Sequence, residues 1–484
     1  MRRTLFQSYP RSLRPHFQHH NSFRLIPKMP LSSHVVPKLR DPSLFREAAF
    51  INGQFVQAKD GKTFDHAINI SRDALKSFRK TLPRERARML RKWYELTMEN
   101  QEDLATLITW ENGKPLADSR GEVAYAAGFF EWFSEEAPRM YGDNIPASVR
   151  GNRVVTVKQP VGVCGLITPW NFPAAMITRK IGPALAAGCT VVAKAPGETP
   201  LTSLAIAELA NRAGIPKGVV NVVTALKNTP EIGKELCTNP IIKKVSFTGS
   251  TGVGKLLMQH CSSTLKKLSL ELGGNAPFIV FDDADLDKAV SGAITSKFRS
   301  SGQTCVCANR IYVQDAVYNE FSKRLAEKVK GFKVVQDHVE DALRKGGTVL
   351  AGGKGLDHLG PNFYEPTVIT NMTSDMRIHR EETFGPIAAL FRFKSEKEVV
   401  DLANEAEVGL AGYFFSSDIA RIWRVAEALE VGMVGVNTGL ISDAASPFGG
   451  VKESGFGREG SKYGIDEYTV IKSITFGGVD ELQE

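Results

Sequence analysis

VSFTGSTGVGKLL, residues 245–257, joins a short apolar run to the start of a helix through a glycine-rich turn. Gly249, Gly252 and Gly254 allow the backbone to turn sharply and to approach a ligand closely. The helix that follows would present unpaired N–H groups and its positive dipole end to a phosphate group. This strand–turn–helix unit predicts an α/β fold with a ligand at the turn.

The residues of the turn allow three interpretations. The spacing from Gly249 to Gly254 and Lys255 nearly matches a P-loop, but Leu256 stands where the Ser or Thr that holds magnesium is needed. The G-x-G-x-x-G dinucleotide pattern does not fit either. A plain tight turn needs no ligand, so the phosphate interpretation depends on neighbouring motifs.

Apolar runs and helical stretches alternate around this turn. The runs are 161–168, 190–194, 219–223 and 245–247, and the helical stretches lie near 173–187, 201–213, 229–237 and 251–262. This alternation predicts βαβ crossovers and a parallel sheet, with ligands beyond the carboxyl ends of the strands. Helical periodicity precedes it at 84–140, and a second apolar and helical series runs from about 275 to 450.

Two further segments, 152–160 and 468–476, alternate like exposed edge strands. Such edges are often paired by another subunit, so the chain is expected to form a homo-oligomer, a dimer or a tetramer.

Charge separates an N-terminal leader from the rest of the chain. Residues 1–40 hold eight basic side chains and no acidic one, whereas residues 41–484 hold 53 of each sign. The neutral body gives no reason to expect a nucleic-acid partner, and no apolar run is long enough for a membrane span. The leader resembles a mitochondrial transit peptide, although a start at Met29 would leave a cytoplasmic form.

FRSSGQTCVCANR, residues 298–310, places Cys305 among small and polar residues. A nucleophilic cysteine needs access and nearby donors for an oxyanion, and small neighbours suit that task. A lone Cys-x-Cys pair is more often structural, and a single pair does not make a zinc site.

LSLELGGNAP, residues 268–277, places Glu271 in an apolar run before two glycines. Burial there would raise the pKa of a carboxylate toward the range of a general base. Alternatively, Glu271 is an acidic residue that simply lies at the edge of the sheet and has no catalytic role. The acidic segment 282–287 does not complete a calcium loop, because Lys288 replaces the required glycine, so no metal site is expected.

Together these segments resemble the aldehyde dehydrogenase superfamily from about residue 39 to the C-terminus. Its motifs occur in family order: TPWNFP (168–173), FTGSTGVG (247–254), LELGG (270–274), GQTC (302–305), EETFGP (381–386) and PFGGVKESGFGRE (447–459). The resemblance implies a Rossmann-like cofactor domain, an α/β catalytic domain and a small oligomerisation β-hairpin. The implied boundaries are 41–141 with 161–271 for the cofactor domain, 272–452 for the catalytic domain, and 142–160 with 453–484 for the hairpin.

The resemblance also implies roles for single residues. Cys305 would be the nucleophile, Asn171 would stabilise the oxyanion with the Cys305 N–H, and Glu271 would activate water. NAD or NADP would be held by Thr168, Pro169, Trp170, Lys194, Gly197, Glu198, Gly249, Ser250, Gly254, Glu382 and Phe384.

Within the superfamily the chain is similar to the succinate-semialdehyde dehydrogenase branch, in 171–190, 304–310 and 458–468. That branch implies a small aldehyde carrying a carboxylate, received by Arg179, Arg299 and Ser442. Structural ion pairing is the alternative role for the arginines. A dehydrogenase for glutarate semialdehyde or another aldehyde, and an inactive structural relative, also stay open.

Three features depart from the family pattern. Gly197 stands where NAD-preferring relatives often carry a glutamate, which permits NADP, although Glu198 could partly replace it. Stretches familiar in the family are missing near 64–71 and 334–336. In addition, Cys307 would form a redox switch with Cys305, as in some members of this branch.

Overall fold

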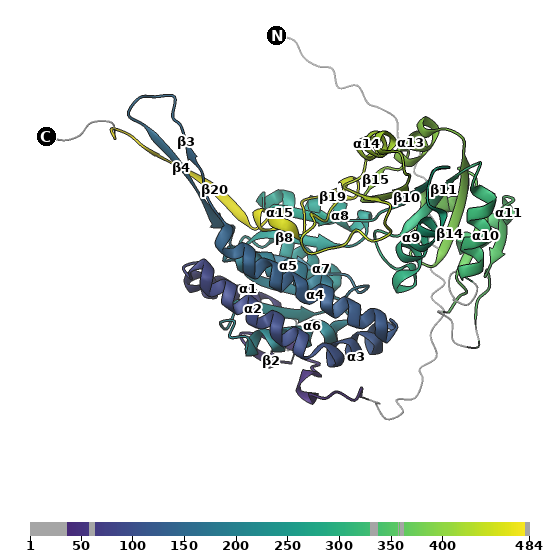
Figure 1. The fold of residues 1–484 in the computed structure, drawn as a ribbon. Helices are drawn as coiled ribbons and strands as arrows, with labels where there is room; N and C mark the ends of the chain where they lie inside the picture. Colours follow the sequence, from purple (N-terminus) through teal and green to yellow (C-terminus); the bar gives the residue numbers. More distant parts are fainter. Residues whose placement is uncertain (1–35, 58–62, 330–336, 357, 359–362, 480–484) are drawn as a thin grey trace, which may run out of the picture. The chain divides into compact units, whose positions relative to one another are not determined.

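Two parallel-stranded sheets organise the chain after Leu39 (Figure 1). The computed structural model describes residues 36–57, 63–329, 337–356, 358 and 363–479. The chain divides into two units, Met1–Lys38 and Leu39–Glu484. Most of the expected leader, 1–35, and the second expected gap, 334–336, lie outside the described residues.

The first sheet has the strand order β19-β9-β8-β5-β6-β7-β1-β2. Its strands are β1 (Ala49–Ile51), β2 (Gln54–Val56), β5 (Val163–Ile167), β6 (Thr190–Ala195), β7 (Val220–Thr224), β8 (Ile242–Thr248), β9 (Lys267–Glu271) and β19 (Gly455–Phe456). The four apolar runs predicted as strands are confirmed as β5 to β8, which pair in parallel. Because β5 and β6 are buried along their whole length, their sequences are continuously apolar rather than alternating.

Helices cover both faces of this sheet. They are α1 (Thr63–Phe78), α2 (Pro83–Glu99), α3 (Gln101–Asn112), α4 (Leu116–Glu136), α5 (Ala175–Ala187), α6 (Pro200–Arg212), α7 (Thr229–Thr238) and α8 (Thr251–Cys261). Helices α2 to α6 pack with Cys164, Leu166 and Val191, and the rings of Trp93 and Phe130 stack at 4.0 Å in that layer. Helices α1, α7 and α8 pack with the alternate strand residues, including Val163 and Val192. The predicted α/β architecture is confirmed.

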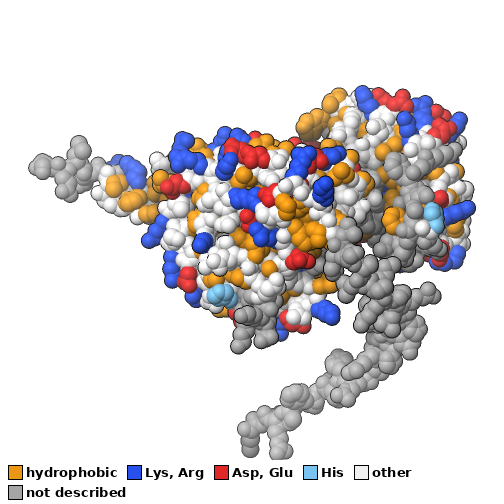
Figure 2. Space-filling view, turned by 90° about the horizontal axis from the view of Figure 1, so that it is seen from below, with side chains coloured by type: hydrophobic (Ala, Val, Ile, Leu, Met, Phe, Trp, Pro, Cys, Tyr) orange, Lys and Arg blue, Asp and Glu red, His pale blue; other side chains and the backbone are white. Residues whose placement is uncertain are grey.

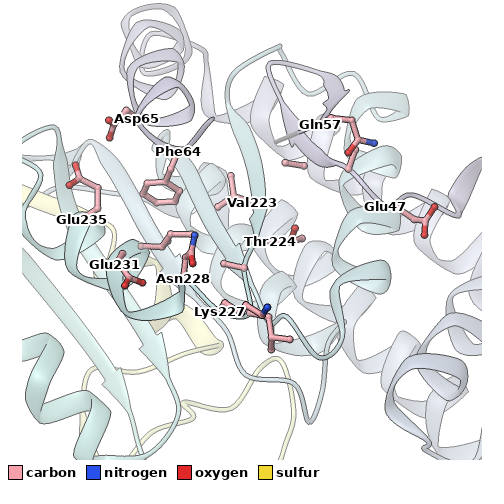
Figure 3. Close-up of a pocket in the computed structure, with 15 residues that line it drawn as sticks. Glu47, Gln57, Phe64, Asp65, Val223, Thr224, Lys227, Asn228, Glu231 and Glu235 are labelled. Carbon is pink, nitrogen blue, oxygen red and sulfur yellow. The ribbon is translucent and has the colours of Figure 1, made fainter. Parts of the chain in front are cut away.

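The first expected gap, 64–71, is spanned by a continuous helix. Helix α1 carries Phe64, Ala67 and Ile68 into the core. Beside its first turn lies a cavity of about 690 Å³, shown in Figure 3. Its walls come from the loop after β7, from α7, and from Phe64 and Asp65 of α1. Residues 64–71 are therefore part of a helix whose first turn borders this cavity.

The second sheet has the order β12-β13-β14-β11-β10-β16-β17. Its strands are β10 (Ala276–Val280), β11 (Ala308–Gln314), β12 (Thr348–Ala351), β13 (Thr367–Thr370), β14 (Ile387–Phe393), β16 (Ala411–Phe415) and β17 (Met433–Val436). Around them lie α9 (Leu286–Phe298), α10 (Tyr318–Val329), α11 (Asp337–Arg344), α12 (Arg377–Arg380), α13 (Glu396–Asn404) and α14 (Ile419–Ala428). Asp285, from the rejected calcium loop, caps α9 by accepting from two backbone N–H groups.

Two antiparallel elements complete the unit. One joins β3 (Asn144–Ile145), β4 (Arg153–Pro160) and β20 (Thr469–Phe476), and the other joins β15 (Val408–Gly409) and β18 (Val451–Lys452). The expectation that 152–160 is an exposed edge is wrong, because β20 pairs along all of β4 and β3 pairs at its beginning. Strand β19 and α15 (Ser461–Asp466) pack with the first sheet and its helices, so only the later part of 453–484 reaches the hairpin.

The surface shows no single dominant charge on the face in Figure 2, where basic and acidic side chains are interspersed. Among the described residues, no helix has the length and apolar character needed to cross a membrane.

Candidate active site

Cys305 follows a strained turn at the end of α9. Ser300 and Ser301 both have left-handed backbone angles, with φ of 50° and 55°, which non-glycine residues rarely adopt. Gly302 follows with φ of 74°, and a Cβ atom there would lie 2.4 Å from the backbone of Gly385. The Ser300 N–H donates to a carboxylate oxygen of Asp118 on α4 at 3.2 Å. Because the contacts with Asp118 and Gly385 hold this turn in place, they also fix the position of Cys305.

Glu271 is the last residue of β9 and lies beside the thiol. The Cys305 Sγ donates to Glu271 Oε1 at 3.5 Å, and the Thr248 hydroxyl donates to Oε2 at 3.2 Å. Burial raises the pKa of the Cys305 thiol to about 12, while Arg179 lowers it and the carboxylate of Glu382 raises it. The thiol therefore holds its proton at neutral pH and has an acceptor for that proton within reach.

Asn171 lies on the other side of the nucleophile loop. Its Nδ2 donates to the carbonyl of Gln303 at 3.0 Å, two residues before Cys305. Its Oδ1 is buried and has no partner among the described residues. The Lys114 ammonium donates to the Asn171 carbonyl at 2.9 Å, which fixes the backbone of Asn171 beside the nucleophile loop. The structure thus brings together all three residues predicted as catalytic.

Arg179 is engaged by carboxylates inside the protein. It forms ion pairs with Glu271 and with Glu459, a residue just before α15, and Lys180 also pairs with Glu459. Arg179 is only 2% exposed. Burial lowers the pKa of Lys180 to about 8, against the opposing influence of Glu459. This geometry favours the structural alternative for Arg179 that the sequence left open.

Arg299 has a different environment. No carboxylate of the described chain lies within ion-pair distance of its guanidinium, which sits 5.6 Å from the ring centre of Phe172. Ser442 lies in the loop after β17, which returns toward α4 where Ala444 comes within 3.9 Å of the Cβ position of Gly128. Of the two arginines predicted to bind the substrate carboxylate, Arg299 is therefore the one whose charge is not paired with a carboxylate of the described chain.

A second cavity, of about 390 Å³, lies between α7 and α8 at the carboxyl ends of the first sheet. Ile167 of β5, Lys194 of β6 and Phe247 of β8 line it, together with Val253 and Leu257 of α8. Strand β8 pairs with β5 on the side opposite β6, so the cavity opens at the point where the strand order reverses. A cavity therefore lies beyond the strand ends, where the sequence predicts a ligand, but its apolar helical walls were not predicted.

The glycine-rich turn, residues 249–254, lies beside this cavity, which Val253 helps to line. Ser250 is the N-cap of α8, and its side chain makes no capping hydrogen bond, so N–H groups of the first turn remain available. Gly249 packs against the Phe247 ring and Gly254 against Leu272, which leaves no room for side chains. At Gly197, a Cβ would lie 2.6 Å from the Ala225 carbonyl, which explains sterically why glutamate is absent there. Glu198, the next residue, raises the pKa of Lys194, although burial lowers it overall.

Glu382 and Phe384 approach from the second sheet. Burial raises the pKa of Glu382 to about 7, and the Gly274 N–H and Lys297 lower it. The Phe384 ring meets the Trp170 ring edge-on at 5.9 Å, next to Thr168 and Pro169. Glu382 and Thr251, at the start of α8, lie 2.8 Å and 3.3 Å from the Cβ position of Gly273, so the second sheet's loop and the α8 turn approach the same glycine.

Cys307 lies behind the nucleophile. It is 2% exposed, and its Sγ contacts the Lys297 carbonyl at 3.8 Å. Both cysteines are free thiols. No group of three or more His, Cys, Asp or Glu side chains suited to a metal ion occurs in the described part of the chain.

Comparisons with known proteins give the family of the chain. Residues 53–474 match the Aldehyde dehydrogenase family. Succinate-semialdehyde dehydrogenase (NADP+) 1 of Schizosaccharomyces pombe is 55% identical, covering 92% of this chain and 99% of the relative. Glutarate-semialdehyde dehydrogenase of Pseudomonas putida is 52% identical, covering 90% of this chain and 99% of the relative.

Among solved structures, an NADP-dependent enzyme of Escherichia coli matches with a TM-score of 0.89 and 50% identity, covering 91% of this chain and all of the other. The match confirms the predicted fold class over nearly the whole described unit. The chain belongs to the aldehyde dehydrogenase family.

Proposed function

We propose that this protein oxidises succinate semialdehyde to succinate with NAD or NADP, through a thiohemiacetal and a thioester on Cys305. The observation that carries the proposal is the 3.5 Å contact between the Cys305 thiol and Glu271, beside the Asn171 amide. The substrates named for the relatives in S. pombe and P. putida support a semialdehyde that carries a carboxylate.

The first half-reaction uses all three residues. Glu271 takes the thiol proton as the sulfur attacks the aldehyde carbon, and a C–S bond forms while the carbonyl oxygen becomes an alkoxide. The Asn171 Nδ2 and the Cys305 N–H donate to that oxygen, where the developing charge is largest. NAD or NADP, held by Lys194, Glu382 and the α8 turn, would supply the hydride acceptor at this carbon, and loss of the hydride would leave a thioester on Cys305.

The second half-reaction belongs to Glu271. After Glu271 has released the thiol proton to solvent, its carboxylate would remove a proton from a water molecule as that water attacks the thioester carbon. The C–S bond then breaks, succinate leaves, and Glu271 returns the proton to the Cys305 sulfur, which restores the thiol. Arg179 holds one Glu271 oxygen throughout, so the carboxylate has a fixed orientation.

The cofactor region fits a dinucleotide. The apolar cavity between α7 and α8 suits an adenine ring, and the free N–H groups at Ser250 and α8 suit a pyrophosphate. Lys194 and Glu382 would hold the riboses. Since Gly197 places no carboxylate against a 2′-phosphate, we propose that NADP is accepted as well as NAD.

The proposed substrate is tested by comparing kcat/KM of the purified full-length protein for succinate semialdehyde, glutarate semialdehyde and butanal. A charge-assisted hydrogen bond contributes about 1.5–3 kcal/mol, so the preferred acid should exceed butanal by roughly 10-fold or more. A higher value for glutarate semialdehyde would reassign the substrate. A folded protein with no turnover on any of the three would indicate the inactive relative.

We propose that Cys307 forms a reversible disulfide with Cys305 under oxidation. In that step a peroxide accepts two electrons, both thiol protons leave in water, and the Cys305 nucleophile is lost. Peroxide should inactivate the parent, and dithiothreitol should restore it, whereas Cys307→Ala should not show reversible inactivation. Equal recovery of both proteins would exclude this switch.

Two further proposals concern the chain outside the site. The outer edge of β20 exposes Ile471 and Phe476, which supports pairing with another copy in a homo-oligomer, a dimer or a tetramer. The basic, acid-free segment 1–40 supports delivery to the mitochondrial matrix.

A further inference from the structure

The hydroxyl of Tyr125 is a buried polar group with no partner. Tyr125 lies on α4, and its Oη is closed off from solvent and makes no hydrogen bond with any described residue. Most buried polar groups are satisfied, so an exception needs a reason such as a catalytic or binding role. The catalytic mechanism above does not use this residue.

Contacts on either side of Tyr125 fix where it points. On α4, Glu122 accepts from the Ala174 N–H at 2.8 Å, and the Phe129 carbonyl lies 3.3 Å from the Cβ position of Gly182. Residues three and four apart share a helix face, so Tyr125 faces α5 between these contacts. The level of α5 midway between Ala174 and Gly182 is that of Thr178, the residue before Arg179.

Neighbouring groups hold the ring at this level. The Tyr125 and Phe129 rings meet edge-on at 4.9 Å, and Phe129 in turn packs 3.4 Å from the Cβ position of Gly460. The loop that carries Ser442 reaches α4 at Gly128 through Ala444. Tyr125 therefore lies within about one turn of α4 from the contact with Gly460, next to Glu459, and from the contact with the loop that carries Ser442.

The surroundings of the hydroxyl are cationic. Burial raises the pKa of Tyr125 to about 12, while Arg179 and Arg299 lower it and Glu459 and Cys305 raise it. The phenol is therefore protonated at neutral pH and can donate. Arg179 is already paired with two carboxylates, whereas Arg299 has no carboxylate partner in the described chain.

We propose that the Tyr125 hydroxyl donates a hydrogen bond to the substrate carboxylate, alongside the guanidinium of Arg299. The proposal rests on the function above, because it requires an aldehyde that carries a carboxylate. It assigns a specificity role to Tyr125 and explains why a hydroxyl is kept unpartnered in the free enzyme. An arginine and a phenol at one carboxylate satisfy more of its lone pairs than either group alone.

The test is Tyr125→Phe, which removes one oxygen atom and keeps the ring that packs on Phe129. The KM for succinate semialdehyde should rise roughly 10- to 100-fold, because the lost hydrogen bond goes to a charged group. The kcat should stay within about twofold, since carboxylate binding is equal in the ground and transition states. Inhibition by succinate should weaken by the same factor as KM rises.

Butanal supplies the internal control, because it has no carboxylate and its kcat/KM should not change in Tyr125→Phe. Tyr94→Phe, on α2, supplies the matched control for the tyrosine-to-phenylalanine change and should behave as the parent. The melting temperature of Tyr125→Phe should equal or exceed that of the parent, since no protein hydrogen bond is lost.

Three outcomes would overturn the proposal. Unchanged KM and succinate inhibition in an active variant would show that the hydroxyl does not contact the carboxylate. Equal losses for succinate semialdehyde and butanal would show a role in packing or chemistry instead. If the parent itself turned over butanal but not succinate semialdehyde, the proposed function would fail, and the carboxylate role of Tyr125 would fail with it.

Discussion

Cys305→Ala should abolish aldehyde oxidation, with a fall in kcat of about 10⁴-fold or more. No other thiol of the described chain lies beside Glu271, and Cys307 points its sulfur toward the Lys297 carbonyl. Loss of a covalent nucleophile removes the thiohemiacetal and the thioester together, so the remaining groups have no intermediate to stabilise.

The measurement is NADH and NADPH formation with succinate semialdehyde at saturating concentration. Cofactor binding, measured by fluorescence titration, should be retained. The reason is that residues of the first sheet and its helices line the cavity between α7 and α8, and Cys305 is not among them. Cys189→Ala is the control, since Cys189 is buried away from the loop and its Sγ contacts the Tyr468 carbonyl. Turnover by Cys305→Ala within about tenfold of the parent would refute nucleophilic catalysis at this residue.

Glu271→Gln should lower kcat by about 10²- to 10⁴-fold at neutral pH, the usual range for loss of a general base. The amide keeps the size of the side chain but accepts no proton from the thiol or from water. Burial raises the pKa of Cys305 to about 12, so its thiolate is scarce at neutral pH and its fraction grows only as the pH rises toward that value. Hydroxide can then replace Glu271 in the first half-reaction sooner than in the second.

Rapid mixing separates the two steps. At alkaline pH, Glu271→Gln should give a burst of NADH or NADPH equal to the enzyme sites, followed by slow turnover, and acid quenching should trap the thioester. The isosteric change also leaves Arg179 without one of its two carboxylates, so the melting temperature is measured in parallel. Fast steady-state turnover after the burst would assign water activation to another residue.

Much of the fold was predictable because its strands are buried on both faces. Continuous apolar runs such as 190–194 and 219–223 need covering helices on each side, and that pattern is visible in the letters. The pairing of β4 could not be predicted, because its partner β20 lies about 300 residues along the chain. The alternation of apolar and polar residues in 152–160 indicates that one face of the strand is exposed. It does not show which edge of the strand is paired with a neighbouring strand.

The candidate site was predictable where a residue acts through its own local motif. Cys305, Glu271 and Asn171 each occur in such a motif, and the structure places them together. The partners of Arg179 were not predictable, since ion pairing with Glu459 depends on how α15 packs near α5. The sequence also contains no indication of a role for Tyr125. Whether the hydroxyl of a helical tyrosine has a hydrogen-bond partner depends on the packing around it, which the sequence does not show.

Residues 272–275, which join the two sheets, contain Gly273 and Gly274, a pair that in a linker usually provides flexibility. Here each glycine is pressed against catalytic-site atoms: a Cβ at Gly274 would lie 2.5 Å from the Cys305 carbonyl, and one at Gly273 would lie 2.8 Å from Glu382. The Ser454 hydroxyl also donates to the Gly273 carbonyl at 2.7 Å. The segment 272–275 is therefore held rigidly. Its backbone contacts set the distance between the Cys305 thiol and the Glu271 carboxylate. A methyl group added at Gly274 would therefore push against the backbone of the nucleophile itself, so this short connection also sets where Cys305 lies.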